Sequence, residues 1–492
     1  MKKSKMAISA AALLLAAALS ATAEGSRDSG KAGAQVPEAE TGTITWWDHY
    51  APLAPMHQEM WTAYAAAKPG VKVEYTQYEP NKLKDALPLA FASKQLPDVF
   101  ANVMGMPDVA LQQAGWYQPM TVEKAALSPI VQQSLFEGYT LFGGKVYSLP
   151  TLSNKNHPAA LWYNKELVKK AGYPTEDIPS DYASIREIAK KVTEQGSGKV
   201  YGIIMPLKFV IRMQSTIMDL AMAAGAPGEG NVMLAVDWKT GKYVYDGEAY
   251  RKVFAFIKQL IDDGSLHPAS LNLDMRQARE RWVNGEAALM LDGSWNIGVV
   301  AGSFASFADK VGVASSVPVP TKETKPYIYR GPVGGTFFIS SNSKNPKKST
   351  DILLKFMSQE YYVKLAERMD QPPLDTGAVA KANVHPTYKR VVANFEREMR
   401  FAPSPVIRNP DVSIALSRMR AITPNLGEIA QGMAAGAIAD YAAALSEFNK
   451  AVGAERDRAI AEVKAEGKKV GVDDWIFSNW VPGKDYSQEM YK

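Results

Sequence analysis

Several apolar segments of this 492-residue chain end in side chains that could bind a ligand. The most concentrated group is Trp46, Trp47, Asp48 and Tyr50, which close the segment that begins at Thr43. An aromatic ring can stack on the apolar face of a ligand, and a carboxylate can accept hydrogen bonds from hydroxyl groups. These residue types predict noncovalent recognition of a small polar solute.

Alternation along a strand limits what this group can do. Trp46 and Trp47 point to opposite faces of an extended segment, so at most one of them is expected to meet a solute while the other packs in the core. Asp48 could accept a hydroxyl group or cap the turn that follows, and the sequence leaves both roles open.

A further candidate, Trp295, follows the stretch DMRQARERWVNGEAALMLDGS. This stretch predicts a helix over 274–283 with Arg279 on its exposed side, a buried strand over 286–291, and a second helix capped by Ser294. A large ring that follows a buried strand, beside the free N–H groups of a helix start, lies where open α/β sheets bind ligands. The alternative is that Trp295 packs beneath a loop.

Amide, guanidinium and glycine residues complete the candidate set. Asn154 can both donate and accept hydrogen bonds, which suits a solute with hydroxyl groups. Arg330 could bind a pair of hydroxyl groups or an anionic group, with an exposed strand cap as its alternative role. Gly334 and Gly335 would let the backbone approach a ligand closely.

Catalytic motifs are largely missing. The sequence has no GxSxG, HExxH or GxxxxGK[ST] pattern, and its five histidines form no helical metal-binding pair. We therefore expect no cofactor, no metal and no enzymatic activity. Paired carboxylates among the 51 acidic residues still allow a secreted glycoside hydrolase, which is the main alternative. A protein that only binds other proteins is a third possibility, which the aromatic residues at segment ends disfavour.

The N-terminal part has the features of an export signal. Residues 1–23 combine early lysines, an apolar stretch and a small-residue cleavage site, the pattern of a signal peptide. Its removal takes away three lysines and no acid, which lowers the formal net charge from +5 to +2 and leaves no indication of nucleic-acid binding. Residues 24–40 predict a flexible leader. Because the sequence has no cysteine, no disulfide and no lipid-modified cysteine are expected, and a soluble periplasmic protein is predicted.

The elements that would position the candidate side chains alternate between strands and helices. Strands are expected over 43–50, 71–80 and 98–103 with helices between them, which predicts a mostly parallel sheet covered by helices. Gly143-Gly144 predicts a tight hairpin turn, and Asn164 predicts a helix start. With 46% hydrophobic residues, the chain is long enough to bury the cores of two lobes.

Seven segments, in this order, resemble the extracellular solute-binding proteins of ABC importers, family 1, the group that includes maltose-binding protein. They are TITWWDHY, KQLPDVFANV, FGGKVYSLPTL, LWYNKELVKKAGYP, WVNGEAALMLDGSWNIG, VGVASSVPVP and GGTFFISSNSKNPKKSTDILLKFM. The resemblance covers nearly all of the mature chain. Its departures are a long C-terminal part after Ala378 and a loose match at Asp370-Gln371-Pro372.

The resemblance implies an α/β fold of two lobes in a Venus-flytrap architecture, each a mostly parallel sheet flanked by helices. It places the three chain crossings near Leu149–Asn154, Val317–Thr321 and Gln371–Asp375. One lobe would hold residues 41–151 and 321–371, and the other residues 152–320 and 372–492.

The resemblance also implies a function. Such a protein would capture a small polar solute, a mono- or oligosaccharide above all, between its lobes and deliver it to ABC permease subunits in the inner membrane. By position, Asn102 and Met104 resemble residues of the loop that contacts ligand in this family. A monomer that closes on its ligand by hinge bending is expected.

Overall fold

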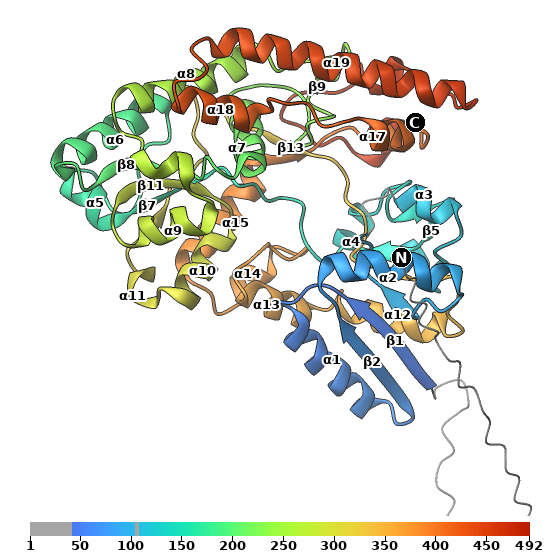
Figure 1. The fold of residues 1–492 in the computed structure, drawn as a ribbon. Coiled ribbons are helices and arrows are strands. Elements are labelled where there is room, and N and C mark those ends of the chain that lie inside the picture. The colour runs from blue at the N-terminus through green and yellow to red at the C-terminus, as the bar shows by residue number, and fades with distance from the viewer. Residues whose placement is uncertain (1–41, 104–107) are drawn as a thin grey trace, which may run out of the picture.

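The computed structural model describes residues 42–103 and 108–492. The expected signal peptide, the expected leader and Met104 lie outside the described residues. Two separate clusters of buried apolar side chains divide the described chain into two lobes, called here the N-lobe and the C-lobe. Figure 1 shows the helices and strands of the two lobes. The expected two-lobe α/β architecture is confirmed.

The N-lobe is built on a five-stranded sheet in the order β2-β1-β3-β14-β6. These strands are β1 (Gly42–Asp48), β2 (Val71–Gln77), β3 (Val99–Phe100), β6 (Ser148–Leu149) and β14 (Phe337–Ile339). β1 is parallel to β2 and β3, whereas β14 is antiparallel to β3 and β6. The carboxyl ends of β1, β2 and β3 therefore share one edge of the sheet, where ligand-binding side chains gather in open α/β folds.

The C-lobe sheet has four strands in the order β12-β7-β11-β8. They are β7 (Ala160–Asn164), β8 (Tyr201–Ile204), β11 (Ala287–Asp292) and β12 (Val311–Val313). β11 is parallel to β8 but antiparallel to β7, and β12 is antiparallel to β7, so this sheet is mixed rather than mostly parallel. Every residue of β7 and β11 is buried, as in strands covered on both faces.

Helices and short two-stranded pairs surround the two sheets (Figure 1). The short pairs are β4 (Leu141–Phe142) with β5 (Lys145–Val146), β9 (Val236–Asp237) with β10 (Lys242–Tyr243), and β13 (Ile328–Arg330) with β15 (Met399–Phe401). The helices are α1 (Ala54–Ala67), α2 (Pro80–Ala92), α3 (Asp108–Gln113), α4 (Pro129–Gln133), α5 (Lys165–Lys170), α6 (Tyr182–Gly196), α7 (Val210–Ala223), α8 (Glu248–Asp262), α9 (Met275–Val283), α10 (Trp295–Ser303), α11 (Ala305–Ala308), α12 (Pro346–Lys355), α13 (Gln359–Glu367), α14 (Ala378–Lys381), α15 (Pro386–Glu398), α16 (Pro405–Arg408), α17 (Val412–Arg418), α18 (Leu426–Ala434) and α19 (Tyr441–Ala465).

Local sequence signals set several of these boundaries. Asp274 starts α9 with a capping box, and Gly285 (φ 81°) follows its last turn. The Asn164 side chain accepts hydrogen bonds from the first backbone N–H groups of α5. Gly143 and Gly144 both have positive φ in the β4–β5 hairpin. These helix and hairpin predictions are confirmed.

The chain passes between the lobes at three places. The first crossing follows β6, and the third lies between α13 and α14. These two crossings run side by side, because Ser153 N–H donates to Pro372 O (2.9 Å) and Leu374 N–H donates to Thr151 O (3.0 Å). Their backbones form a short antiparallel pair at the waist of the molecule.

The second crossing lies further along the chain than expected. Val317 and Val319 pack in the C-lobe core, and Val319 bridges to Asp181 of the same lobe. Strand β13 also belongs to the C-lobe, where it pairs with β15, and the chain joins the N-lobe sheet only at β14. The crossing is therefore the segment 331–336. The prolines near residue 320 mark a bend inside the C-lobe.

The part of the chain after Ala378 completes the C-lobe. Its long helix α19 lies at the end of that lobe farthest from the N-lobe sheet (Figure 1). No helix within the described residues is long and apolar enough to cross a membrane.

Candidate functional site

Trp295 begins helix α10, directly after the buried strand β11 and the turn at Gly293. Its indole N–H donates to Asp292 Oδ1 (2.7 Å), and the ring is half-buried. The ring lies against Gly293, where an added Cβ would come within 2.3 Å of it, so only glycine fits this turn without moving the ring. The strand and its turn therefore fix the indole while leaving part of its surface accessible.

A buried ion pair behind the ring holds Asp292 in place. Arg279 donates to Asp292 Oδ2 (2.5 Å) and to Asn296 Oδ1 (2.9 Å), and both charged side chains are buried. The prediction that Arg279 lies on the exposed side of its helix is wrong. The helix turns this residue inward because the Asp292 carboxylate offers it a charged partner.

Ser294 has a different role from the expected helix cap. Its hydroxyl makes no capping hydrogen bond and instead donates to the backbone oxygen of Asp370 (2.7 Å). This bond connects the β11–α10 turn to the third crossing. The turn that presents Trp295 is thus attached directly to a hinge segment.

Trp295 has two neighbours at the start of α7, Phe209 and Arg212, that the sequence did not predict. The Arg212 guanidinium lies 4.8 Å from the centre of the Trp295 ring and 5.9 Å from that of Phe209. Burial lowers the pKa of Arg212 from its ordinary value. Because β8 and β11 are parallel, the residues after both strands meet at one edge of the sheet. These neighbours could not be predicted because the sequence does not reveal that β8 and β11, which are far apart in the chain, pair in parallel.

The N-lobe candidates at the end of β1 separate into buried and accessible residues. Trp46 is fully buried against Trp61 and Phe356. Asp48 is also fully buried and accepts hydrogen bonds from His57 Nδ1 and from the Tyr75 hydroxyl, both at 2.8 Å. Neither side chain has surface with which to contact a solute, so we correct the ligand-binding expectation for both.

Asp48 fixes the end of β1 instead. Its Oδ1 accepts the backbone N–H groups of His49 and Tyr50. Burial raises the pKa of Asp48, but the hydrogen bond and charge of His57, with the bonds from Tyr50 and Tyr75, hold it below the ordinary value. Trp47 and Tyr50 are half-buried at this strand end, and Trp47 lies 5.1 Å from the ring of Tyr78, a residue that follows β2. The aromatic surface at this edge therefore comes from Trp47, Tyr50 and Tyr78.

Residues of both lobes line a cavity of about 460 Å³. The N-lobe contributes Asn102 and Asp108, the second crossing contributes Gly334, and the C-lobe contributes Glu229 and Asn231. The Asn102 amide donates to Asp108 Oδ1 (2.6 Å). Burial raises the pKa of Asp108 and that of Glu229 to about 7 in each case. Two of the predicted residues, Asn102 and Gly334, thus face a polar space between the lobes.

Three other predicted residues support the crossings. Asn154 of the first crossing donates its amide N–H to Gly331 O of the second (2.7 Å). Arg330 forms an ion pair with buried Asp219 of α7 (2.8 Å), so its charge is already matched. Gly335 lies against Ser148 of β6, where an added Cβ would come within 2.2 Å of the serine side chain, and this close approach of the crossing to β6 explains the glycine.

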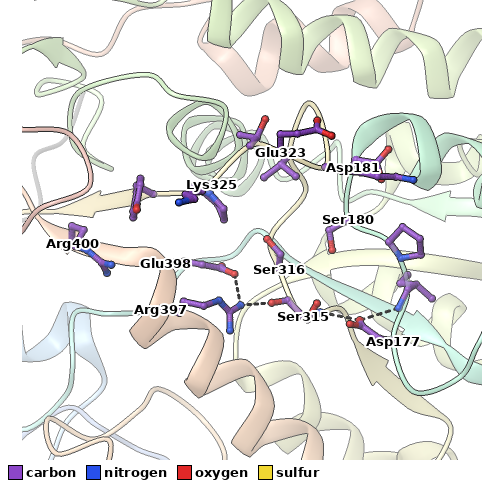
Figure 2. A pocket seen from close by; sticks show the side chains of 17 residues that line it. Asp177, Ser180, Asp181, Ser315, Ser316, Glu323, Lys325, Arg397, Glu398 and Arg400 are labelled. Carbon is purple, nitrogen blue, oxygen red and sulfur yellow. Dashed lines mark hydrogen bonds and ion pairs between the residues drawn. The ribbon is translucent and has the colours of Figure 1, made fainter.

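A second cavity, of about 1050 Å³, lies within the C-lobe (Figure 2). Some of its charged side chains form hydrogen bonds within the cavity lining: Arg397 donates to Glu398 Oε1 (2.9 Å), and Asp177 accepts the backbone N–H of Ser315 (3.0 Å). It contains no predicted site residue and no residue of the N-lobe. We therefore take the region between the lobes as the candidate site.

Known proteins resemble this chain over most of its length. A family model described as bacterial extracellular solute-binding protein matches residues 48–358. The sugar-binding protein MalE from Xanthomonas citri has the same fold, with a TM-score of 0.61 at 17% identity over 87% of this chain and 100% of that one. The GacH receptor of Streptomyces glaucescens has a TM-score of 0.58 at 20% identity over 86% of this chain and 99% of that one.

Curated sequences match over shorter spans. A fructooligosaccharide ABC transporter substrate-binding protein, FusA of Streptococcus pneumoniae, is 23% identical over 55% of this chain and 54% of its own length. An uncharacterised lipoprotein of Streptomyces antibioticus is 29% identical over 34% of this chain and 36% of its own length. The chain thus spans about half or less of these two relatives.

Proposed function

Because this chain belongs to the bacterial extracellular solute-binding protein family, we propose that it is the substrate-binding component of an ABC transporter. It captures a small polar solute, a mono- or oligosaccharide, between its lobes and delivers it to permease subunits in the membrane. The names of its relatives support this ligand class, since they include sugar-binding and fructooligosaccharide-binding proteins.

One observation carries the proposal: aromatic surface lies at the carboxyl-end edge of each lobe's sheet. Trp295 provides it in the C-lobe, and Trp47 with Tyr78 provides it in the N-lobe. Sugar rings have apolar faces that stack on such side chains. The proposed contacts are Trp47, Tyr50, Asn102, Gly334 and Trp295, together with Met104, which stays a prediction from position alone.

Binding is tested by a thermal-shift screen of the mature protein against neutral and acidic saccharides and polyols. A true ligand at about 100 times its Kd adds about 2.7 kcal/mol to the unfolding free energy. Hits are then measured by calorimetry. A panel in which no saccharide shifts the transition would contradict the proposal.

The glycoside hydrolase alternative has one observation in its favour, the carboxyl groups of Asp108 and Glu229 in a shared cavity. A glycosidase needs two such groups roughly 5 to 9.5 Å apart. Incubation of each hit with the protein, followed by chromatography of the sugar, distinguishes the two functions. A binding protein returns the saccharide intact, whereas steady turnover would make the chain an enzyme.

The cellular setting is part of the proposal. We propose a soluble, monomeric periplasmic protein without a lipid anchor, since the sequence has no cysteine to carry one. Because one of its relatives is a lipoprotein, the absence of a lipid anchor needs an experimental test. Osmotic-shock fractionation should release the protein without detergent, and light scattering should give the monomer mass. Recovery in the membrane fraction would contradict the absence of an anchor.

A further inference from the structure

Arg212 differs from the two other arginines near the candidate site in having no carboxylate partner. Arg279 pairs with Asp292 and Arg330 pairs with Asp219. Within residues 42–103 and 108–492, no acidic side chain lies within ion-pair distance of Arg212, and its guanidinium makes no hydrogen bond there. Its contacts are with the faces of two aromatic rings.

This arrangement leaves a positive charge incompletely compensated at the sheet edge where Trp295 lies. The attraction between a guanidinium and an aromatic ring is weaker than the hydration that a half-buried cation gives up. Both nearby carboxylates are already used by Arg279 and Arg330. The planar guanidinium can bind a carboxylate or phosphate with two parallel hydrogen bonds, and within the described residues its N–H groups are not used in any hydrogen bond.

Apolar surface accompanies the charge. Phe209, beside the guanidinium, is 42% exposed, and Ile211 on the same turn is 57% exposed. Large apolar side chains left in water next to an unpaired cation suit a ligand with both an apolar face and an anionic group. A neutral sugar would use the rings but leave the cation unmatched.

We infer that Arg212 determines the specificity of this site and that the solute is an acidic saccharide, a sugar whose anionic group pairs with the Arg212 guanidinium. The ring of the sugar lies on the aromatic surface of Phe209 and Trp295. This inference rests on the proposed function and narrows its ligand class. The anionic group is a carboxylate, as in a uronate, or a phosphate ester.

The test is calorimetric titration of the mature protein with three matched arrays: uronate oligosaccharides of several linkages, their neutral methyl esters, and hexose phosphates. Arg212→Gln removes the charge, Arg212→Lys keeps it without the two-pronged geometry, and Arg276→Gln removes the same charge from an exposed arginine of α9. Melting curves of all three variants establish that they fold.

The acidic member with the highest affinity should bind at least about 10-fold more tightly than its neutral counterpart. Arg212→Gln should weaken the binding of this acidic saccharide by about 10- to 100-fold, and Arg212→Lys should weaken it by a smaller factor. The control Arg276→Gln should change the affinity by under about 2-fold. Tight binding of a uronate oligosaccharide would identify the anionic group as a carboxylate, and tight binding of a hexose phosphate would identify it as a phosphate. Preferred binding of a neutral saccharide with unchanged affinity in Arg212→Gln would overturn this inference and leave the proposed function intact. If no saccharide binds, both fail.

Discussion

At the scale of single residues, Trp295 is the side chain whose removal best separates binding from folding. The Trp295→Ala change should weaken saccharide binding by about 2 kcal/mol, because a half-buried ring at a binding edge behaves as a contact residue. The loss of unfolding free energy should be smaller than the roughly 3–5 kcal/mol expected for a core tryptophan. Calorimetry and urea denaturation of the same preparation measure the two quantities.

Trp46 provides the matched control for this prediction. It is fully buried in the N-lobe core, so Trp46→Phe should lower stability and leave affinity unchanged once the protein is folded. The opposite result for Trp295→Ala, a large loss of stability with wild-type affinity, would place the indole in the core rather than in the site.

Asp108 gives a prediction about pH. Burial raises its pKa from 3.8 to about 7, so the folded state keeps this proton to a higher pH than the unfolded chain does. The stability contributed by the neutral form is complete below about pH 4 and is lost as the pH rises to about 7. Asp108→Asn should therefore raise the melting temperature at pH 8 and leave it nearly unchanged at pH 4.

The control for this pH effect is Asp85→Asn, which removes a charge from the exposed side of α2 in the same lobe. It should not reproduce the gain at pH 8. Equal gains from both variants would show that net charge, rather than burial of Asp108, is responsible.

The sequence predicts the role of a single residue when the residues that it contacts lie close to it in the chain. Alternation predicted that one of Trp46 and Trp47 is core, but only the distant rings of Trp61 and Phe356 show that it is Trp46. The role of Arg212 depends on Trp295, which lies on a strand-to-helix turn more than eighty residues later. No pattern in one sequence reveals such pairs.

At the scale of elements, α9, β11 and α10 form a unit held by the Arg279–Asp292 ion pair. Arg279→Met should lower the unfolding free energy by about 3–5 kcal/mol, because it leaves the Asp292 carboxylate buried without its cation. Adding Asp292→Asn should recover part of this loss, since the remaining group is neutral and can still accept the Trp295 N–H. Chemical denaturation of the single and double variants measures both effects.

The matched control lies on the same helix. Arg281 pairs with Glu286 at the surface, at 2.7 Å and with both side chains partly exposed, so Arg281→Met should cost under about 1 kcal/mol. Equal losses for Arg279→Met and Arg281→Met would contradict the buried role of Arg279.

The sequence predicted elements well where the signal was local. The capping box at Asp274, the left-handed glycine at Gly285 and the apolar run before Asp292 each depend on a few neighbouring residues. Strand partners depend on distant segments, and the second crossing was therefore misplaced. Val319 follows a proline in a pattern that suggests a linker, yet it pairs with Asp181, and β13 pairs with a strand about seventy residues later.

At the scale of the whole molecule, the three crossings form one laterally bonded hinge. The backbones of the first and third crossings pair at Ser153 and Leu374, and Asn154 connects the first to the second. Beside them the lobes touch where the Tyr139 hydroxyl lies 2.9 Å from Ser404 Oγ. The separate apolar cores of the lobes allow each to move as a unit about this connected waist.

Hinge closure on ligand is the last prediction. A saccharide that contacts the edges of both lobes gains more contacts in a closed state than in an open one, so its binding should shift the population towards closure. Small-angle scattering of the mature protein should therefore show a smaller radius of gyration with the bound saccharide than without it. Trp295→Ala at the same saccharide concentration should show a weaker contraction, because fewer molecules are occupied. An unchanged radius at full occupancy would mean that the solute binds to one lobe without bringing the two together.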